Sequence, residues 1–136
     1  MKTLAITTAA LFAAFSLQAF AAEPKEAKTA SGIVITTLKE GTGAGPRSSD
    51  TVKVHYRGTL VSGKEFDSSY GRGQPSTFPL NRVIPCWTEG LQTMKIGGKA
   101  KLLCPPNLAY GSRGIPGTIP ADATLIFEVE LLEIIK

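Results

Sequence analysis

"VIPCWTEGLQ", residues 83–92, joins a proline, a cysteine and the only tryptophan of the chain to the start of a helical pattern. Pro85 suits the first turn of a helix, where its missing N–H has no intrahelical partner to lose. Trp87, Leu91 and Met94 recur at i, i+4 and i+7, the spacing of one buried helical face. A pair of glycines ends the pattern. We therefore predict one short helix of roughly ten residues, which must pack against other elements to be stable.

The segments on either side of this helix have the alternation of half-buried β-strands. In "TVKVHYRGTL", residues 51–60, Val52, Val54 and Tyr56 alternate with charged or polar residues. Further strands are predicted over 33–41, 99–104 and 123–136, with a brief extended piece at 76–80 and a long Gly/Pro loop at 105–122. Four or five strands and one short helix predict an α+β fold, in which an antiparallel sheet covers the helix.

The first residues have the pattern of a secretory signal. Lys2 precedes an uncharged, mostly apolar run that ends in small residues at Ala19 and Ala21. Polar residues inside this run argue against a membrane anchor, so we expect export without stable membrane insertion. The predicted organisation is a signal peptide over 1–21, a flexible N-terminal arm over 22–32 and one domain over 33–136.

The residue inventory excludes several kinds of site. His55 is the only histidine and lies on the polar face of its strand, so no nucleophile with a histidine base can be assembled. One histidine and two separated cysteines supply too few ligands for zinc, and no glycine-rich loop leads into a lysine at a helix start. We expect no metal and no cofactor. Basic residues are scattered among acids, so we expect no nucleic-acid partner.

Cys86 and Cys104 both lie in the part of the chain that we expect to be exported. Thiols in an oxidising compartment tend to pair, which favours a disulfide. Such a bond would contribute roughly 3 kcal/mol through the loop that it closes. Two buried free thiols are the alternative, because sequence spacing does not establish the geometry.

Apolar and aromatic side chains are dense near the predicted loops, which indicates an apolar pocket with few polar groups. They are Tyr56, Phe66, Phe78, Val83, Ile84, Trp87, Tyr110, Ile119 and Phe127. An ordinary place in the core explains most of them equally well. That explanation is weaker for Tyr110, because it lies in the Gly/Pro loop.

Four motifs together resemble a known family. In chain order they are "VHYRGTL", "GKEFDSS", "VIPCWTEGLQTMKIGGKAKLLCPPNLAYG" and "ATLIFEVELL". They are similar to the FKBP-type peptidyl-prolyl cis-trans isomerases, specifically the exported bacterial group, and the similarity extends over residues 33–136. It implies a five-stranded, twisted antiparallel sheet wrapped around one short helix, with the active pocket between them. It also implies a periplasmic or secreted protein.

The resemblance implies the site residues as well. Asp67 and Tyr110 would be catalytic, and the indole of Trp87 would form the floor of a proline pocket. The other substrate-binding residues would be Tyr56, Phe66, Phe78, Val83, Ile84, Ile119 and Phe127. If Cys86 and Cys104 are bonded, their disulfide would tie the start of the helix to the sheet under this pocket.

The function implied by the resemblance is accelerated rotation about X-Pro bonds during the folding of exported proteins. The partners would be proline-containing unfolded chains or peptides, and macrolide inhibitors. Ser76 and Thr118 depart from the family pattern and are expected to open one wall of the pocket, so the affinity for large macrolides does not follow from the resemblance. A proline-binding chaperone with negligible turnover is the alternative. We expect a monomer, because the helical dimerisation segment of some exported bacterial relatives is missing from the sequence.

Overall fold

The computed structural model describes residues 25–136, so the expected leader at 1–21 and its cleavage site lie outside the described residues. The strands are β1 (Lys25–Lys28), β2 (Val34–Lys39), β3 (Thr51–Leu60), β4 (Glu65–Ser68), β5 (Ser76–Pro79), β6 (Lys99–Cys104) and β7 (Leu125–Ile135). The helices are α1 (Ser69–Arg72) and α2 (Pro85–Leu91), with single 3₁₀ turns η2 (Leu80–Arg82) and η3 (Pro106–Leu108). Within the described part of the chain, no helix has the length and apolar composition that a membrane crossing requires.

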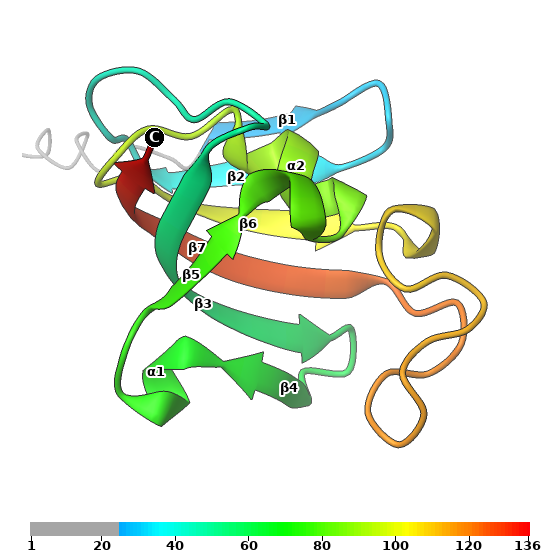
Figure 1. The fold of residues 1–136 in the computed structure, drawn as a ribbon. Coiled ribbons are helices and arrows are strands. Elements are labelled where there is room, and N and C mark those ends of the chain that lie inside the picture. The colour runs from blue at the N-terminus through cyan, green and yellow to red at the C-terminus, as the bar shows by residue number, and fades with distance from the viewer. Residues whose placement is uncertain (1–24) are drawn as a thin grey trace, which may run out of the picture.

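The strands form one antiparallel sheet in the order β1-β2-β6-β7-β3-β4, and β5 pairs with β3 on the same edge as β4. Figure 1 shows this curved sheet with α2 packed on one face. The predicted α+β class is confirmed. The five predicted extended stretches contain β2, β3, β5, β6 and β7, whereas β1 and β4 were not predicted.

β1 arises from the segment that was predicted as a flexible arm, 22–32. Lys25–Lys28 pairs antiparallel with β2 across a tight turn, in which Gly32 adopts φ 101°. The side chain of Thr29 supports this turn by accepting a hydrogen bond from the N–H of Ile33 at 3.1 Å. All four residues of β1 are exposed, so the strand has no apolar alternation from which it could have been predicted.

α1 interrupts the edge of the sheet and was not predicted. Ser68 has extended backbone and caps the helix by accepting a hydrogen bond from the N–H of Gly71 at 3.2 Å. Gly73 ends the helix in the left-handed conformation, at φ 78°. This single turn returns Arg72 to the side chain of Asp67, which is the last but one residue of β4.

α2 is shorter than predicted, because it ends at Leu91 and not near the glycine pair. The hydroxyl of Thr93 donates to the carbonyl of Gly90 at 2.7 Å. The N–H groups of Thr93 and Met94 bond three residues back, to Gly90 and Leu91, at 3.1 and 3.0 Å. These bonds replace the four-residue ladder and stop the α-helix.

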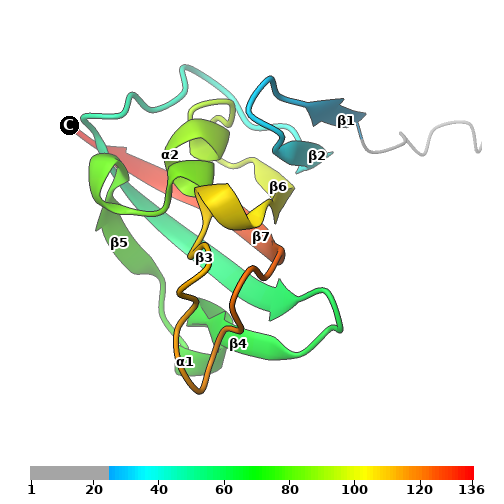
Figure 2. The same cartoon turned by 90° about the vertical axis from the view of Figure 1, so that its right-hand side faces the viewer.

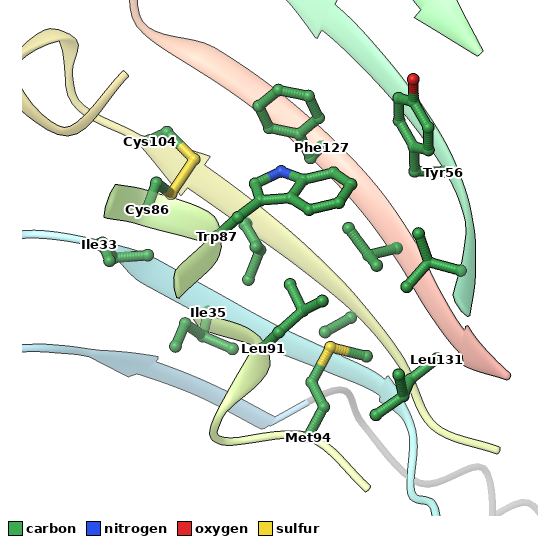
Figure 3. Packing of buried hydrophobic residues seen from close by; sticks show 14 of the residues in the cluster. Ile33, Ile35, Tyr56, Cys86, Trp87, Leu91, Met94, Cys104, Phe127 and Leu131 are labelled. Carbon is green, nitrogen blue, oxygen red and sulfur yellow. A yellow bond between two sulfur atoms is a disulfide. The ribbon is translucent and has the colours of Figure 1, made fainter. Parts of the chain in front are cut away.

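The core lies between α2 and the face of the sheet that it covers (Figure 3). Trp87 and Leu91, which belong to the predicted apolar face, are buried within α2, and Met94 is buried after the helix has ended. Cys86 and Cys104 form the favoured disulfide, with a Cα–Cα distance of 5.7 Å and no solvent exposure of either residue. The bond joins the first turn of α2 to the last residue of β6.

Candidate functional site

A cavity of about 500 Å³ lies among α2, strands β3, β4, β5 and β7, and the loop that follows η3. This volume is in the range of small-ligand pockets. In Figure 2 the loop between β6 and β7, which contributes Ala109 and Tyr110 to the lining, faces the viewer. The residues that line the cavity are Tyr56, Phe66, Asp67, Phe78, Arg82, Val83, Ile84, Trp87, Ala109, Tyr110 and Phe127. They include every predicted site residue except Ile119.

Four aromatic rings lie around the indole at the bottom of the cavity: three contact the indole itself, and the fourth contacts one of those three. Trp87 packs edge-to-face against Tyr56, Phe78 and Phe127, with ring centroids 5.2 to 5.4 Å apart. Phe66 meets Phe127 in the same way at 5.6 Å. Because edge-to-face pairs are favoured by the ring quadrupoles, these rings hold one another in a defined apolar box. Figure 3 shows the indole between Phe127 and Tyr56.

The indole is almost buried but still borders the cavity, with an exposed fraction of 4%. Its Nε1 makes no hydrogen bond within residues 25–136. In Figure 3 the nitrogen edge is turned toward Phe127, whose ring plane is at 84° to the indole. The indole therefore offers an apolar surface to anything that enters the cavity.

Gly58 on β3 allows two of these rings to come together. A Cβ at this position would lie 2.6 Å from Phe66 and 2.8 Å from Phe127, which is too close for any side chain. Glycine is thus required here because the two rings leave no room for a Cβ, and not because of the backbone conformation.

The disulfide lies directly beside the residue that forms the bottom of the cavity. Cys86 precedes Trp87 in the first turn of α2, and Cys104 ends β6. The covalent link fixes the start of α2 against the sheet, and with it the backbone that carries the indole.

A polar network forms the side of the cavity at β4. The hydroxyl of Tyr56 donates a short hydrogen bond to one carboxylate oxygen of Asp67. Arg72 donates to the other oxygen at 2.6 Å, and to the hydroxyl of Tyr56 and to Ser76 at 3.1 Å each. The Ser68 N–H adds a further hydrogen bond to Asp67 at 2.9 Å. The carboxylate is therefore held in one orientation.

These contacts also decide the ionisation of the network. Burial alone raises the pKa of Asp67, but hydrogen bonds from Tyr56 and Arg72 and the charge of Arg72 outweigh it and hold the pKa below its usual 3.8. Burial, followed by the hydrogen bond to Asp67, raises the pKa of Tyr56. At neutral pH Asp67 is a carboxylate and Tyr56 a neutral hydroxyl. The hydroxyl therefore orients the negative charge of Asp67, and the pair does not supply a proton.

Tyr110 lies across the cavity in the loop after η3, and its side chain is 38% exposed. Partial burial, and then the charge of Asp67, raise its pKa, so the hydroxyl is protonated at neutral pH. The loop backbone is hydrogen-bonded internally: Gly111 donates to Pro106 and Asp122 donates to Gly111, both at 2.8 Å. The Tyr110 hydroxyl is thus a donor at the entrance, carried by a defined loop.

Three residues named from the resemblance are not among those that line the cavity. Ile119 does not line the cavity, because its backbone pairs with Ile115 at 2.7 Å and its side chain joins the core. Ser76 and Thr118 also do not line it, and the open wall expected at these positions stays a prediction. Ser76 instead accepts a hydrogen bond from Arg72.

Arg72, Arg82 and Ala109 are site residues that the sequence did not indicate. Arg72 reaches Asp67 only because α1 reverses the chain, and Arg82 is the last residue of a 3₁₀ turn that was not predicted. The only sequence signal was the proximity of Arg82 to the predicted residues Val83 and Ile84. Among residues 25–136, no group of three or more His, Cys, Asp and Glu side chains could hold a metal ion.

His55 has a structural contact on the other side of β3. Its Nδ1 is 2.8 Å from the hydroxyl of Ser69, and its ring stacks on Tyr70 with centroids 4.6 Å apart. Ser69 is fully buried and also accepts a hydrogen bond from the N–H of Tyr56 at 2.7 Å. The His55–Ser69 contact therefore joins α1 to β3.

The chain belongs to the FKBP-type peptidyl-prolyl cis-trans isomerase family, whose model matches residues 43–132. It is similar to the FKBP-type peptidyl-prolyl cis-trans isomerase FkpA from Escherichia coli strain K12, with 55% identity over 114 residues. These residues are 83% of this chain and 42% of FkpA, so the chain spans less than half of that relative. An FKBP-type 22 kDa peptidyl-prolyl cis-trans isomerase from the same strain is 50% identical over 107 residues, which are 79% of this chain and 52% of that protein.

The fold agrees with solved structures of this family. The crystal structure of FkpA from Escherichia coli matches with a TM-score of 0.79 and 51% identity, covering 87% of this chain and 55% of that one. The crystal structure of a peptidyl-prolyl cis-trans isomerase from Pseudomonas syringae pv. tomato matches with a TM-score of 0.78 and 40% identity, covering 85% of this chain and 84% of that one. The predicted FKBP-like fold is confirmed.

Proposed function

We propose that this protein is a peptidyl-prolyl cis-trans isomerase that accelerates rotation about X-Pro bonds in exported polypeptides. The observation that carries the proposal is the cavity, in which an aromatic box around Trp87 faces an oriented carboxylate and a free tyrosine hydroxyl. Membership of the isomerase family supports the same reaction. The substrates are proline-containing unfolded chains or peptides.

The reaction requires no bond to break. An X-Pro bond rotates slowly because amide resonance must be lost, which costs roughly 20 kcal/mol. A catalyst lowers this barrier by binding the twisted amide more tightly than the planar one. The planar form has more charge separation, so transfer from water into an apolar box disfavours it relative to the twisted form.

The lining residues supply this differential binding in distinct ways. The rings of Trp87, Phe66 and Phe127 hold the pyrrolidine ring and exclude water from the amide. The Tyr110 hydroxyl donates to a substrate carbonyl and fixes its position. The N–H of Ile84 is a second donor, because it precedes α2 and makes no backbone hydrogen bond within residues 25–136.

Asp67 acts through charge and position. Arg72 and Tyr56 hold its carboxylate at the wall of the cavity, where it interacts with the carbonyl carbon of the twisted amide as that carbonyl turns. Because Asp67 is ionised and Tyr56 neutral at neutral pH, the mechanism includes no proton transfer.

We further propose that the protein acts as a monomer in the periplasm or outside the cell. The apolar run that ends at Ala19 to Ala21 supports export. The Cys86–Cys104 bond supports it independently, since structural disulfides persist in oxidising compartments.

Exchange rates of a Leu-Pro or Phe-Pro peptide between its cis and trans forms test the function. Wild type is expected to accelerate exchange, and Trp87→Leu, Asp67→Ala and Tyr110→Phe are expected to reduce that acceleration. Circular dichroism of each variant controls for folding. If wild type binds the peptide without accelerating exchange, the protein is a proline-binding chaperone and not an isomerase.

A further inference from the structure

Arg82 is a cation at the mouth of the cavity that the Asp67 network does not use. It ends η2 and directly precedes Val83 and Ile84, which line the cavity. Arg82 is exposed, yet it is itself one of the lining residues. Arg82 is therefore a residue placed where the cavity meets solvent.

The charges around the entrance do not cancel. Asp67 is the only carboxylate among the lining residues, and Arg72 already binds it at 2.6 Å. Arg82 forms no salt bridge with any carboxylate in residues 25–136. Glu89 lines a second hollow that shares Val83 with the cavity, and Glu89 forms no salt bridge with Arg82. The entrance therefore carries an unbalanced positive charge.

A peptide with its proline ring in the aromatic box must place the neighbouring residues at this entrance, because successive Cα atoms are only about 3.8 Å apart. A guanidinium binds both oxygens of a carboxylate and repels an ammonium group. We propose that Arg82 makes the protein prefer prolyl peptides with an acidic residue next to proline over peptides with a basic residue there. This inference rests on the proposed isomerase function and specifies its substrate class.

Solvent sets the size of the preference. Exposed ion pairs are weak, so we expect kcat/KM for a glutamate peptide to exceed that for the matching lysine peptide by about threefold at low salt. At about 1 M salt the screening length falls to about 3 Å, so the ratio should approach one.

The experiment uses the full chain and two series of peptides. One series has Glu, Gln or Lys immediately before proline, and the other has the same residues immediately after it. Acceleration of exchange gives kcat/KM, and quenching of the single tryptophan gives the dissociation constant of each peptide. The proteins are wild type, Arg82→Gln, Arg82→Glu and the control Arg47→Gln, which removes the same charge from an exposed residue outside the cavity.

Wild type and Arg47→Gln are expected to prefer Glu over Lys in at least one series. Arg82→Gln should abolish that preference, and Arg82→Glu should reverse it. The same Glu-to-Lys ratio in wild type and in both Arg82 variants would overturn the inference.

If wild type binds the peptides but accelerates none of them, the proposed isomerase function fails instead. The charge dependence of the dissociation constants then decides the role of Arg82 separately.

Discussion

The floor and the rim of the cavity are held by different kinds of interaction. The floor, defined as Trp87 with the surrounding rings and the Cys86–Cys104 disulfide, is largely buried, mostly apolar and cross-linked at the start of α2. The rim, defined as Asp67, Arg72, Arg82 and Tyr110, is polar and partly exposed. Burial and cross-linking contribute several kcal/mol, whereas exposed polar contacts contribute little to stability. Changes to the floor are therefore expected to lower stability, and changes to the rim to alter catalysis.

The largest loss of stability is expected when the disulfide is removed from beneath the floor. Cys86→Ala with Cys104→Ala opens a loop of sequence separation 18, which should lower the free energy of unfolding by about 3 kcal/mol. Urea denaturation of the double variant and of oxidised wild type measures the difference. A change below about 1 kcal/mol would mean that packing alone fixes the start of α2.

A smaller loss is expected from Gly58→Ala, which crowds the floor without removing any contact. The added Cβ would lie within 2.8 Å of both Phe66 and Phe127, so at least one ring must move. Overpacking of this kind typically costs about 1–3 kcal/mol, and the displaced ring should also reduce peptide affinity. Gly71→Ala is the control, because an added Cβ there would lie 3.9 Å from its nearest neighbour, the Cβ of Ser68. Gly63→Ala is unsuitable, because Gly63 has a positive φ of 95°. Equal stability and affinity of Gly58→Ala and Gly71→Ala would contradict the spatial role of Gly58.

Replacing Asp67 by Asn at the rim should change stability only slightly and in a pH-dependent way. The pKa of Asp67 is lower in the folded protein than its usual 3.8, so its carboxylate stabilises the fold above that pH. This contribution is lost as the pH falls through the lower, folded pKa. Because the side chain is 40% exposed, the difference from Asp67→Asn at neutral pH should not exceed about 1 kcal/mol.

Thermal or urea unfolding of both proteins between pH 2 and pH 7 measures this difference. The two stability curves should be separated by a constant amount above about pH 5 and converge below about pH 4. Curves that stay parallel throughout would show that the carboxylate is not stabilised by Arg72 and Tyr56.

The smallest effect on stability is expected for Tyr110→Phe, because this hydroxyl has no hydrogen-bond partner among residues 25–136 and is near solvent. Loss of one hydrogen bond to the substrate should nevertheless lower kcat/KM by about threefold to tenfold. Tyr70→Phe is the matched control, since its hydroxyl bonds Glu130 away from the cavity at 3.3 Å. An unchanged kcat/KM in Tyr110→Phe would remove this hydroxyl from the mechanism.

The parts of the fold that are determined by residues close together in the sequence could be predicted. Alternation identified β3, β6 and β7, and Pro85 identified the start of α2. The missed features depend on contacts between segments or on single hydroxyl groups. β1 exists through pairing with β2, and α2 ends where the hydroxyl of Thr93 takes the carbonyl of Gly90.

The same distinction applies to the site. The aromatic lining followed from the family resemblance, because those positions are tied to motifs of fixed order. Arg72 and Arg82 could not be assigned, since the position of a long, exposed side chain depends on the turn that carries it. The buried position of Ile119 could not be predicted, because a Gly/Pro loop gives no periodicity from which the direction of a side chain could be inferred.

The loop that carries Tyr110 has a kinetic consequence. Glycine and proline punctuate it, but bonds from Gly111 to Pro106 and from Asp122 to Gly111 hold it in place before any guest arrives. We therefore expect a guest chain to enter and leave without a slow gating motion, unlike the substrates of enzymes that close a lid. The cycle time of this protein should then be governed by encounter with the guest or by the rotation itself.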